Sequence, residues 1–443
     1  MDVCDKPKGP RAPLGPRPPV FALVDVNNFY VSCERAFNPT LCNIPVVVLS
    51  NNDGCAVARS NEVKALGVKM GAPWFKMREL AEQHGIVALS SNYTLYGDMS
   101  NRVVSVLREF SPDMEVYSID ESFLRVETTA RIYGGHRTMG HTIRERVRRW
   151  TGLPVCVGFG ETKTLAKFAN HLAKKNTQFN GVCDLTGMTA VERDHWMRRI
   201  EVGEVWGIGR RIAARLADMR VLTVYDLAHA GPKAIRKQFG VVVERTVSEL
   251  CAVSCMPLED VAPLKQQIMS SRSFGKMQHT RQQVGEAVAW HIHNAAEKLR
   301  AQGAVAGSVH VFVQTNRFRE QDEQYNGSIV VPLPDVSDDT TVLTTWAMRG
   351  LGRIFREGYA YKKCGVMLMA LEQKHLRQET LFDDPAARMK STKVMAVLDS
   401  VNSLWGRGTL RTAAAGYSQH WAMRSENRSP RYTTNWKELP IAR

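Results

Sequence analysis

The sequence predicts an α+β protein built from several domains. In the first 184 residues, short apolar runs with strand character alternate with segments that repeat apolar residues at helical spacing. Residues 185–250 show an almost entirely helical pattern, and strand-like runs return at 309–313 and 366–371. A chain of 443 residues is also too long for one ordinary domain, so three or four compact units are expected.

The elements of the first part can be placed from their composition. The apolar run 20–26 predicts a buried strand, and the β-branched run 44–49 predicts a second one. Residues 115–126 predict two strands that close around a turn at Ile119, Asp120 and Glu121. Apolar residues at helical spacing predict helices at 60–66, 75–83, 99–110, 137–150 and 162–175. Residues 1–19 are rich in Pro, Gly and basic residues and predict a disordered extension.

The composition favours an acidic partner. The net charge is +15, and an excess of Lys and Arg on this scale favours binding to a polyanion such as nucleic acid, although a basic protein without such a partner has the same composition. The nine cysteines are odd in number and lack a CxxC pair, which argues against a zinc site or a disulfide framework. No apolar run has the length of a membrane span, so a cytoplasmic protein without a membrane partner is expected.

Three acidic residues stand where a rigid sheet would hold them. Asp25 ends the first buried strand, and Asp120 and Glu121 lie in the turn between two strands. Adjacent acids repel each other unless a cation relieves the repulsion. Carboxylates at strand ends suit the two Mg²⁺ ions of phosphoryl transfer, whereas acids in turns also serve as caps or solvated hairpin tips. Residue type alone leaves both interpretations open.

The acidic residues stand in two motifs, residues 25–34 (DVNNFYVSCE) and residues 117–123 (YSIDESF). These motifs resemble the first and second acidic motifs of Y-family DNA polymerases, in the same order. Similarity to the UmuC branch in particular rests on segments 48–54, 58–59, 64–69, 91–93, 96–101, 162–167 and 429–434. The resemblance extends from about residue 20 to residue 436.

The resemblance implies a catalytic metal site. Asp25, Asp120 and Glu121 would be the catalytic carboxylates and the ligands of Mg²⁺. The backbone carbonyl of Val26 would complete one of the two metal positions.

The resemblance also implies a nucleotide site. Tyr30 would be the steric gate, a flat ring beneath the incoming sugar that excludes a 2′ hydroxyl; residue type alone would make it a core aromatic. Arg59, Lys64 and Lys174 are candidates for binding the incoming triphosphate. Asn61 departs from the family pattern, because branches other than UmuC carry Tyr at this position.

A glycine-rich turn predicts contact with DNA. Gly207 and Gly209 precede a helix and resemble a helix–hairpin–helix, in which backbone N–H groups approach a DNA phosphate; a simple helix–helix turn has the same pattern. Lys163 and Lys167 lie opposite the apolar stripe of the helix 162–175, so a solvated helix face is predicted for them, with contact to DNA as the alternative.

A short motif near the end predicts docking to a sliding clamp. Gln378, Leu381 and Phe382 fit the pattern QxxLF in a polar segment after the last strand-like run. The alternative is that Leu381 and Phe382 pack back onto the preceding domain.

The resemblance implies a right-hand polymerase with a ferredoxin-like palm, small fingers, a helical thumb and a little finger. The expected boundaries are an extension at 1–19, palm at 20–42 and 92–184, fingers at 43–91, thumb at 185–257, little finger at 264–372 and a C-terminal tail at 373–443. The implied function is error-prone translesion synthesis in the SOS response, with dNTPs and primed, damaged DNA as substrates. The implied partners are a UmuD′-like dimer, RecA and the β sliding clamp, in the bacterial cytoplasm at the nucleoid. The alternatives are a non-catalytic DNA-binding scaffold and a nucleotidyl cyclase on a similar palm.

Overall fold

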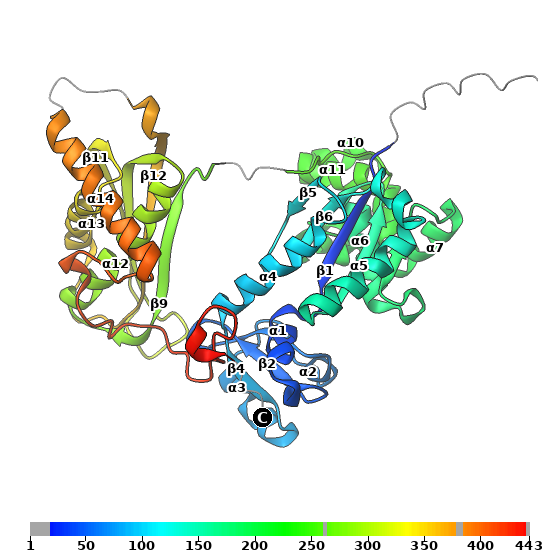
Figure 1. Ribbon diagram of the computed structural model, residues 1–443, viewed down its shortest axis with the longest axis horizontal. Coiled ribbons are helices and arrows are strands. Elements are labelled where there is room, and N and C mark those ends of the chain that lie inside the picture. The colour runs from blue at the N-terminus through cyan, green and yellow to red at the C-terminus, as the bar shows by residue number, and fades with distance from the viewer. Residues whose placement is uncertain (1–17, 260–263, 378–383, 440–443) are drawn as a thin grey trace, which may run out of the picture.

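Strand β1 (Phe21–Val26) lies at the centre of a five-stranded sheet whose order is β5-β6-β1-β7-β8. The other strands are β5 (Met114–Val116), β6 (Glu121–Arg125), β7 (Val155–Gly160) and β8 (Val182–Asp184). All pairs are antiparallel except β7 with β8. The computed structural model describes residues 18–259, 264–377 and 384–439. Figure 1 shows this sheet at one end of the molecule.

Alternation along β1 sends its side chains to two different cores. Ala22, Val24 and Val26 face the helices α4 (Tyr93–Leu107) and α5 (His136–Thr151), with which they share one hydrophobic core. Phe21 and Leu23 face the helix α6 (Lys163–Lys175), whose Ala166 packs against them. Asp25 follows in the same alternation, so its carboxylate lies on the α6 side of the sheet.

A three-stranded sheet, β3-β2-β4, forms a second unit next to the five-stranded sheet. It contains β2 (Val46–Leu49), β3 (Ala56–Arg59) and β4 (Val87–Ser90), with β2 antiparallel to β3 and parallel to β4. Its own small core includes residues from α2 (Asn61–Ala65) and α3 (Trp74–His84). Helix α1 (Phe29–Phe37) connects β1 to this unit.

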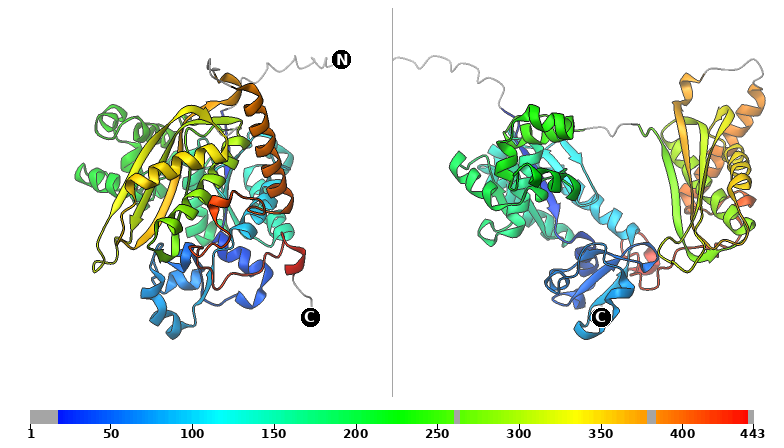
Figure 2. Two further views of the ribbon diagram at one scale, coloured as in Figure 1. Left: turned by 90° about the vertical axis from the view of Figure 1, so that its left-hand side faces the viewer. Right: turned by 180° about the vertical axis from the view of Figure 1, so that it is seen from behind.

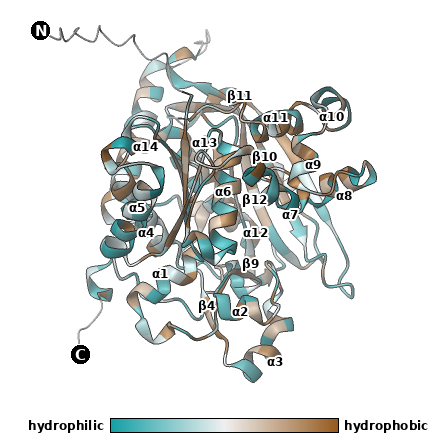
Figure 3. Ribbon diagram, turned by 90° about the vertical axis from the view of Figure 1, so that its right-hand side faces the viewer, coloured by the Kyte–Doolittle hydropathy of each residue, from teal (hydrophilic) through white to brown (hydrophobic). Residues whose placement is uncertain are grey.

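The predicted helical region contains five helices within the described residues. These are α7 (Ala190–Arg199), α8 (Arg210–Asp218), α9 (Val224–Ala228), α10 (Pro232–Phe239) and α11 (Val241–Leu250). They share a hydrophobic core with the outer face of α6, which joins them to the five-stranded sheet. Hydrophilic and hydrophobic residues are mixed along α8 and α10, as expected for helices with one exposed face (Figure 3).

A four-stranded antiparallel sheet, β11-β10-β12-β9, forms the opposite end of the molecule (Figures 1 and 2). Its strands are β9 (Ile268–Gln278), β10 (Ala304–Thr315), β11 (Asn326–Ser337) and β12 (Tyr361–Gln373). Helices α12 (Arg281–Ala301) and α13 (Thr340–Ile354) share the core of this sheet.

The expected C-terminal tail contains a long helix. Helix α14 (Pro385–Trp405) is tied to α12 by the Arg300–Asp399 ion pair, and its Met395 and Leu398 are buried. Residues 406–439 then return toward the three-stranded sheet, as Figure 2 shows from behind. Their packing was missed because the segment lacks long apolar runs and is held mainly by polar contacts. Within the described ranges, every helix is too short or too polar to span a lipid bilayer.

Candidate active site

The two acidic motifs meet at the end of β1. Asp25 on β1 lies directly opposite Glu121 on β6, and the N–H of Val26 donates to the carbonyl of Asp120 at 2.9 Å. The hydroxyl of Ser118 donates to the Asp120 carboxylate at 2.7 Å and accepts the N–H of Glu121 at 3.0 Å. The predicted turn between two strands is therefore present, and backbone hydrogen bonds fix the acidic residues against the central strand.

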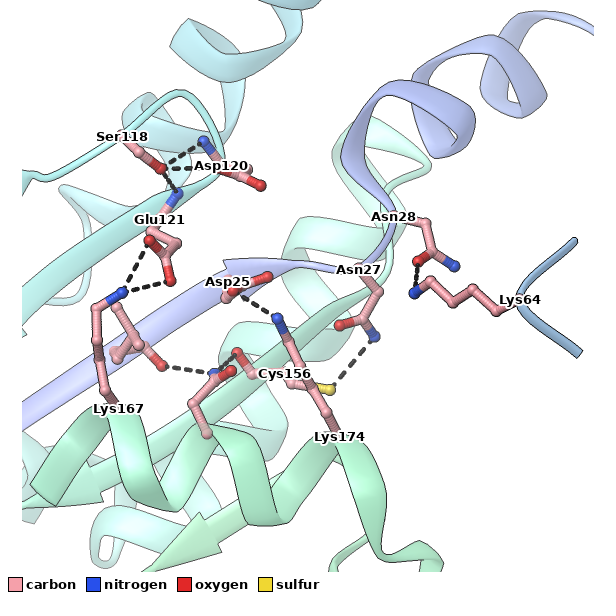
Figure 4. Close-up of polar contacts among 12 residues, drawn as sticks. Asp25, Asn27, Asn28, Lys64, Ser118, Asp120, Glu121, Cys156, Lys167 and Lys174 are labelled. Atoms are coloured by element: carbon pink, nitrogen blue, oxygen red, sulfur yellow. Dashed lines mark hydrogen bonds and ion pairs between the residues drawn. The ribbon is translucent and has the colours of Figure 1, made fainter. Parts of the chain in front are cut away.

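Two lysines of α6 neutralise two of these acids (Figure 4). Lys174 Nζ lies 2.5 Å from a carboxylate oxygen of Asp25, and Lys167 Nζ lies 2.8 Å and 3.0 Å from the two oxygens of Glu121. The predicted solvated face for Lys167 and Lys163 is wrong. Lys167 is 15% exposed, and Lys163 is buried in an ion pair with Glu115, because α6 lies across the sheet and brings these lysines to its carboxylates.

The acids carry an electrostatic cost that a cation relieves. Burial raises the pKa of the Asp25 carboxyl to about 6, Lys174 lowers it, and the nearby Glu121 and Asp120 raise it further. In the described part of the chain, no three acidic, His or Cys side chains converge as a ready-made metal site. Asp25 and Glu121 face lysines, and Asp120 accepts from Ser118. The donors are carboxylate oxygens, the ligands that Mg²⁺ prefers.

A cavity of about 580 Å³ opens beside Asp25. Asp25, Val26 and Asp120 line one part of it, whereas Glu121 lines a neighbouring cavity that also contains Lys167 and Lys174. Of the predicted metal ligands, the structure therefore places three around the larger cavity and Glu121 beside it.

Basic side chains line the same cavity. Arg59, Lys64, Lys174 and Lys175 all contribute to its wall. Burial lowers the pKa of Lys64, and repulsion from Arg59, Lys174 and Lys175 lowers it further. A cavity with carboxylates on one side and clustered cations on the other suits a polyphosphate that carries a divalent cation.

Tyr30 lines the cavity and also packs against the core. Its ring stacks on Tyr96 with a centroid distance of 4.4 Å and contacts Tyr93 edge-on at 6.1 Å. Tyr30 belongs to helix α1, and Asn28 is the N-cap of that helix in a left-handed conformation with φ 49°. The side-chain amide of Asn28 donates to the side-chain oxygen of Asn61 at 3.0 Å. Asn61 thus lies in the cavity wall and supports the turn that presents Tyr30.

The glycine-rich turn leads into helix α8, an arrangement that a helix–hairpin–helix and a simple helix–helix turn share, so contact with DNA stays a prediction. Gly207 adopts φ +87°, which favours glycine, and Gly209 is the N-cap of α8. A Cβ on Gly209 would meet no atom within 4 Å, so packing inside the protein does not require glycine there. Trp206, which precedes the turn, donates its indole N–H to the Tyr117 hydroxyl at 3.1 Å and connects the turn to the five-stranded sheet.

Sequence reasoning missed the support beneath Tyr30. The buried Glu34 carboxylate accepts the Tyr96 hydroxyl at 2.6 Å and the Ser429 hydroxyl at 3.0 Å. Glu34 belongs to the first acidic motif, and Tyr96 and Ser429 belong to segments that resemble the UmuC branch, but only the structure shows that the three residues meet. The predicted clamp-binding residues Gln378, Leu381 and Phe382 lie outside the described residues.

Comparisons with known proteins find similar sequences along most of the chain. Residues 24–171 match the impB/mucB/samB family, residues 265–381 match the C-terminal domain of that family, and residues 392–442 match a domain of unknown function. The chain is 45% identical to protein UmuC of Salmonella typhimurium, over 95% of this chain and 99% of that one. It is 42% identical to protein ImpB of the same organism, over 96% and 100% of the two chains.

Solved polymerase structures share the fold. A Y-family DNA polymerase chimera matches with a TM-score of 0.60 and 19% identity, over 79% of this chain and 98% of that one. An insertion ternary complex of Dbh DNA polymerase matches with a TM-score of 0.53 and 20% identity, with the same coverage.

Proposed function

This chain belongs to the impB/mucB/samB family and is an error-prone translesion DNA polymerase of the SOS response, and we propose that it adds dNTPs to a primer 3′ end by Mg²⁺-dependent nucleotidyl transfer at the Asp25 site. The observation that carries the proposal is the register of β1 and β6, which fixes Asp25 opposite Glu121 and next to Asp120 at the edge of a cavity with a cationic wall. Such a site needs only carboxylates, substrate oxygens and waters to hold Mg²⁺.

The three acids and the Val26 carbonyl are the residues that would hold the metal ions. When bound, Mg²⁺ supplies positive charge to the phosphates and to the attacking and leaving oxygens. Asp25 and Glu121 are held in register by the sheet, and Ser118 orients Asp120. Lys167 and Lys174 supply neutralising charge at Glu121 and Asp25 in the structure described here.

The remaining residues bind and select the substrates. Arg59, Lys64 and Lys174 bind the triphosphate from the cationic wall. Tyr30 lies under the sugar and excludes ribonucleotides. Gly207 and Gly209 present the N-terminus of α8 to a phosphate of the primed, damaged DNA.

The proposed partners and domain roles follow the family resemblance. The five-stranded sheet is the palm, the three-stranded sheet the fingers, the helices α7–α11 the thumb and the four-stranded sheet the little finger. A UmuD′-like dimer and RecA are the proposed protein partners, and the motif at Gln378, Leu381 and Phe382 docks on the β sliding clamp. The protein acts at the nucleoid.

Substitution of Asp120 with Asn tests the proposal. It removes one charge without changing the side-chain volume, so extension of a primed abasic template should fall by roughly 10³-fold, while most DNA affinity, which comes from basic contacts, is retained. Asp113→Asn, at an exposed position one strand away, is the matched control. The assay contains the proposed partners. Equal extension by the parental protein and both variants would show that this site does not catalyse nucleotide addition.

The competing function is a DNA-binding scaffold without catalysis. It gives no reason for three carboxylates to be gathered at a strand end at the cost that the raised pKa of Asp25 reveals. A scaffold would show no template-directed extension in any of these reactions, although it would bind primed DNA.

A further inference from the structure

The C-terminal segment 421–432 runs from the four-stranded sheet to the palm helices. At its start, the buried side chain of Trp421 belongs to the core of the four-stranded sheet, and its backbone carbonyl accepts the N–H of Gly275 at 3.2 Å. At its end, Tyr432 stacks on Phe37 of α1 with a centroid distance of 4.9 Å. This segment lies within the match to a domain of unknown function. We call it the C-terminal strap.

Between these anchors, the strap contacts the three-stranded sheet. The N–H of Arg424 donates to the Asn52 side chain at 3.0 Å, and the N–H of Glu426 donates to Asp53 at 3.2 Å. Ser90, at the end of β4, exchanges two hydrogen bonds with Asn427, both 3.0 Å long. The strap therefore extends from one domain across a second before it reaches the palm.

The strap then holds the first turns of α4. Asn92 is the N-cap of this helix, and its side-chain oxygen accepts the N–H of Leu95. The amide of the same side chain donates to the carbonyls of Ser429 and Pro430 at 3.0 Å and 3.1 Å, and to the Ser429 hydroxyl at 2.9 Å. Tyr93 and Tyr96 lie in the first turns of α4, and their rings contact Tyr30. By holding the start of α4, the strap therefore holds the backbone from which both rings extend.

The strap also holds Glu34 of α1. The Ser429 hydroxyl and the Tyr96 hydroxyl both donate to the same carboxylate oxygen of Glu34, at 3.0 Å and 2.6 Å. Glu34 and Tyr96 are almost completely buried, so neither can exchange these partners for water at low cost. A continuous series of contacts thus runs from Ser429 through Glu34 and Tyr96 to the ring of Tyr30.

We propose that the C-terminal strap positions the Tyr30 ring and thereby sets discrimination between dNTPs and ribonucleotides. This inference rests on the proposed role of Tyr30 and assigns a purpose to the segment of unknown function. Ser429 and Asn92 are positioning residues, because they act on Tyr30 through Glu34 and Tyr96. If their contacts are lost, Tyr96 gains freedom, the ring stacked on it shifts, and space opens for a 2′ hydroxyl.

The experiment compares sugar discrimination in Ser429→Ala, Ser429→Thr and the matched control Ser418→Ala. Ser418 is an exposed residue of the same C-terminal region and bonds only to His420 among the contacts of the described residues. The assay measures kcat and KM for dCTP and CTP with the full chain, primed DNA and the proposed partners. Titration of non-hydrolysable forms of both nucleotides against the protein–DNA complex gives the same ratio without turnover.

Ser429→Ala removes the hydrogen bond to Glu34 and the one accepted from Asn92. It should raise the relative use of CTP roughly fivefold, the factor that a typical net hydrogen-bond contribution is worth, with kcat for dCTP unchanged. Ser429→Thr, which keeps the hydroxyl, and Ser418→Ala should match the parental protein. Equal ratios in all variants would refute the strap proposal.

A double mutant separates positioning from general destabilisation. In a Tyr30→Ala background, Ser429→Ala should have no further effect on the sugar ratio, because the strap acts through the missing ring. Additive effects would refute the proposal. If Tyr30→Ala alone leaves the ratio unchanged, the proposed role of Tyr30 fails, whereas a changed ratio in Tyr30→Ala with none in Ser429→Ala rejects only the strap.

Discussion

Replacing Lys167 with Met tests the ion pair that the structure places at Glu121. The substitution removes the ammonium and keeps an apolar stem of similar length. Lys167 Nζ contacts both Glu121 oxygens and lies 4.6 Å and 5.2 Å from the ring centroids of Tyr117 and Trp206. Hydrogen bonds to charged partners contribute about 1.5–3 kcal/mol, and a cation–π contact contributes about 0.5–1 kcal/mol.

The expected cost is large because solvent screens this pair little. Lys167 and Glu121 are 15% and 19% exposed, so the variant leaves a largely buried carboxylate without its countercharge. After allowance for the desolvation of the lysine itself, we expect the free energy of local opening of α6 to fall by about 2–3 kcal/mol. Amide hydrogen exchange in α6, measured by mass spectrometry with chelator present, should accelerate by roughly 30- to 150-fold.

Lys175→Met is the matched control, because Lys175 is an exposed residue of the same helix. Its exchange rates should stay within about twofold of the parental protein, as expected for a surface lysine. A solvated Lys167 would give the same rates in both variants, and that outcome would refute the assignment of Lys167 to Glu121. A double-mutant cycle with Glu121→Gln should return a coupling energy of about 1.5 kcal/mol or more.

Further predictions concern selectivity, DNA binding, clamp docking and pH. Tyr30→Ala should permit primer extension with ribonucleotides alone, and unchanged discrimination would return Tyr30 to a purely core role. Gly209→Ala should leave the melting temperature unchanged, since the site has room for a Cβ, but weaken binding to primed duplex DNA by a few-fold in a salt titration. Replacing Leu381 and Phe382 with Ala should abolish clamp binding in an affinity titration without lowering the melting temperature; a lower melting temperature with intact clamp binding would show that they pack onto the protein. Burial lowers the pKa of His291 to about 4, so this side chain stays neutral in the folded protein at a pH where it is already protonated in the unfolded chain, below about pH 6.5. The contribution of His291 to the free energy of unfolding is therefore fully present above pH 6.5 and decreases toward pH 4, by about 2 kcal/mol between pH 7 and pH 5. Urea denaturation should show this loss in the parental protein but not in His291→Gln.

The structure agrees with the sequence where local patterns decide. The apolar run 20–26 predicts β1, and the paired runs around Asp120 and Glu121 predict the strands β5 and β6. The helix predicted at 99–110 begins earlier, at Tyr93, because the Asn92 side chain caps it. A single capping residue followed by aromatic residues predicts a helix less clearly than the apolar residues at helical spacing later in α4 do. The sequence pattern therefore placed the middle of this helix better than its first residue.

Contacts between distant segments explain what the sequence could not predict. Lys167 is 46 residues from Glu121, and Ser429 is 395 residues from Glu34, so no periodic pattern links them. The helical spacing of α6 places Lys167 opposite the apolar stripe, and in an isolated helix a side chain at that position would be exposed to solvent. Strand β6 and Trp206 cover that side, and only the tertiary arrangement turns a surface position into an ion pair.

The elements that hold the acids differ from those that hold Tyr30, and this separation makes the two roles experimentally independent. The acids depend on β1, β6 and α6, whereas Tyr30 depends on α1, α4 and the C-terminal strap. The two sets join at Asn27 and Asn28, between β1 and α1, where the left-handed conformation of Asn28 turns the chain. Loosening the strap should therefore change the choice of sugar while leaving the dNTP rate intact. Lys167→Met should lower the stability of the carboxylate site while leaving the choice of sugar unchanged. If either variant altered both properties equally, the two sets of elements would act as a single rigid unit, and assigning sugar selection to the strap alone would be wrong.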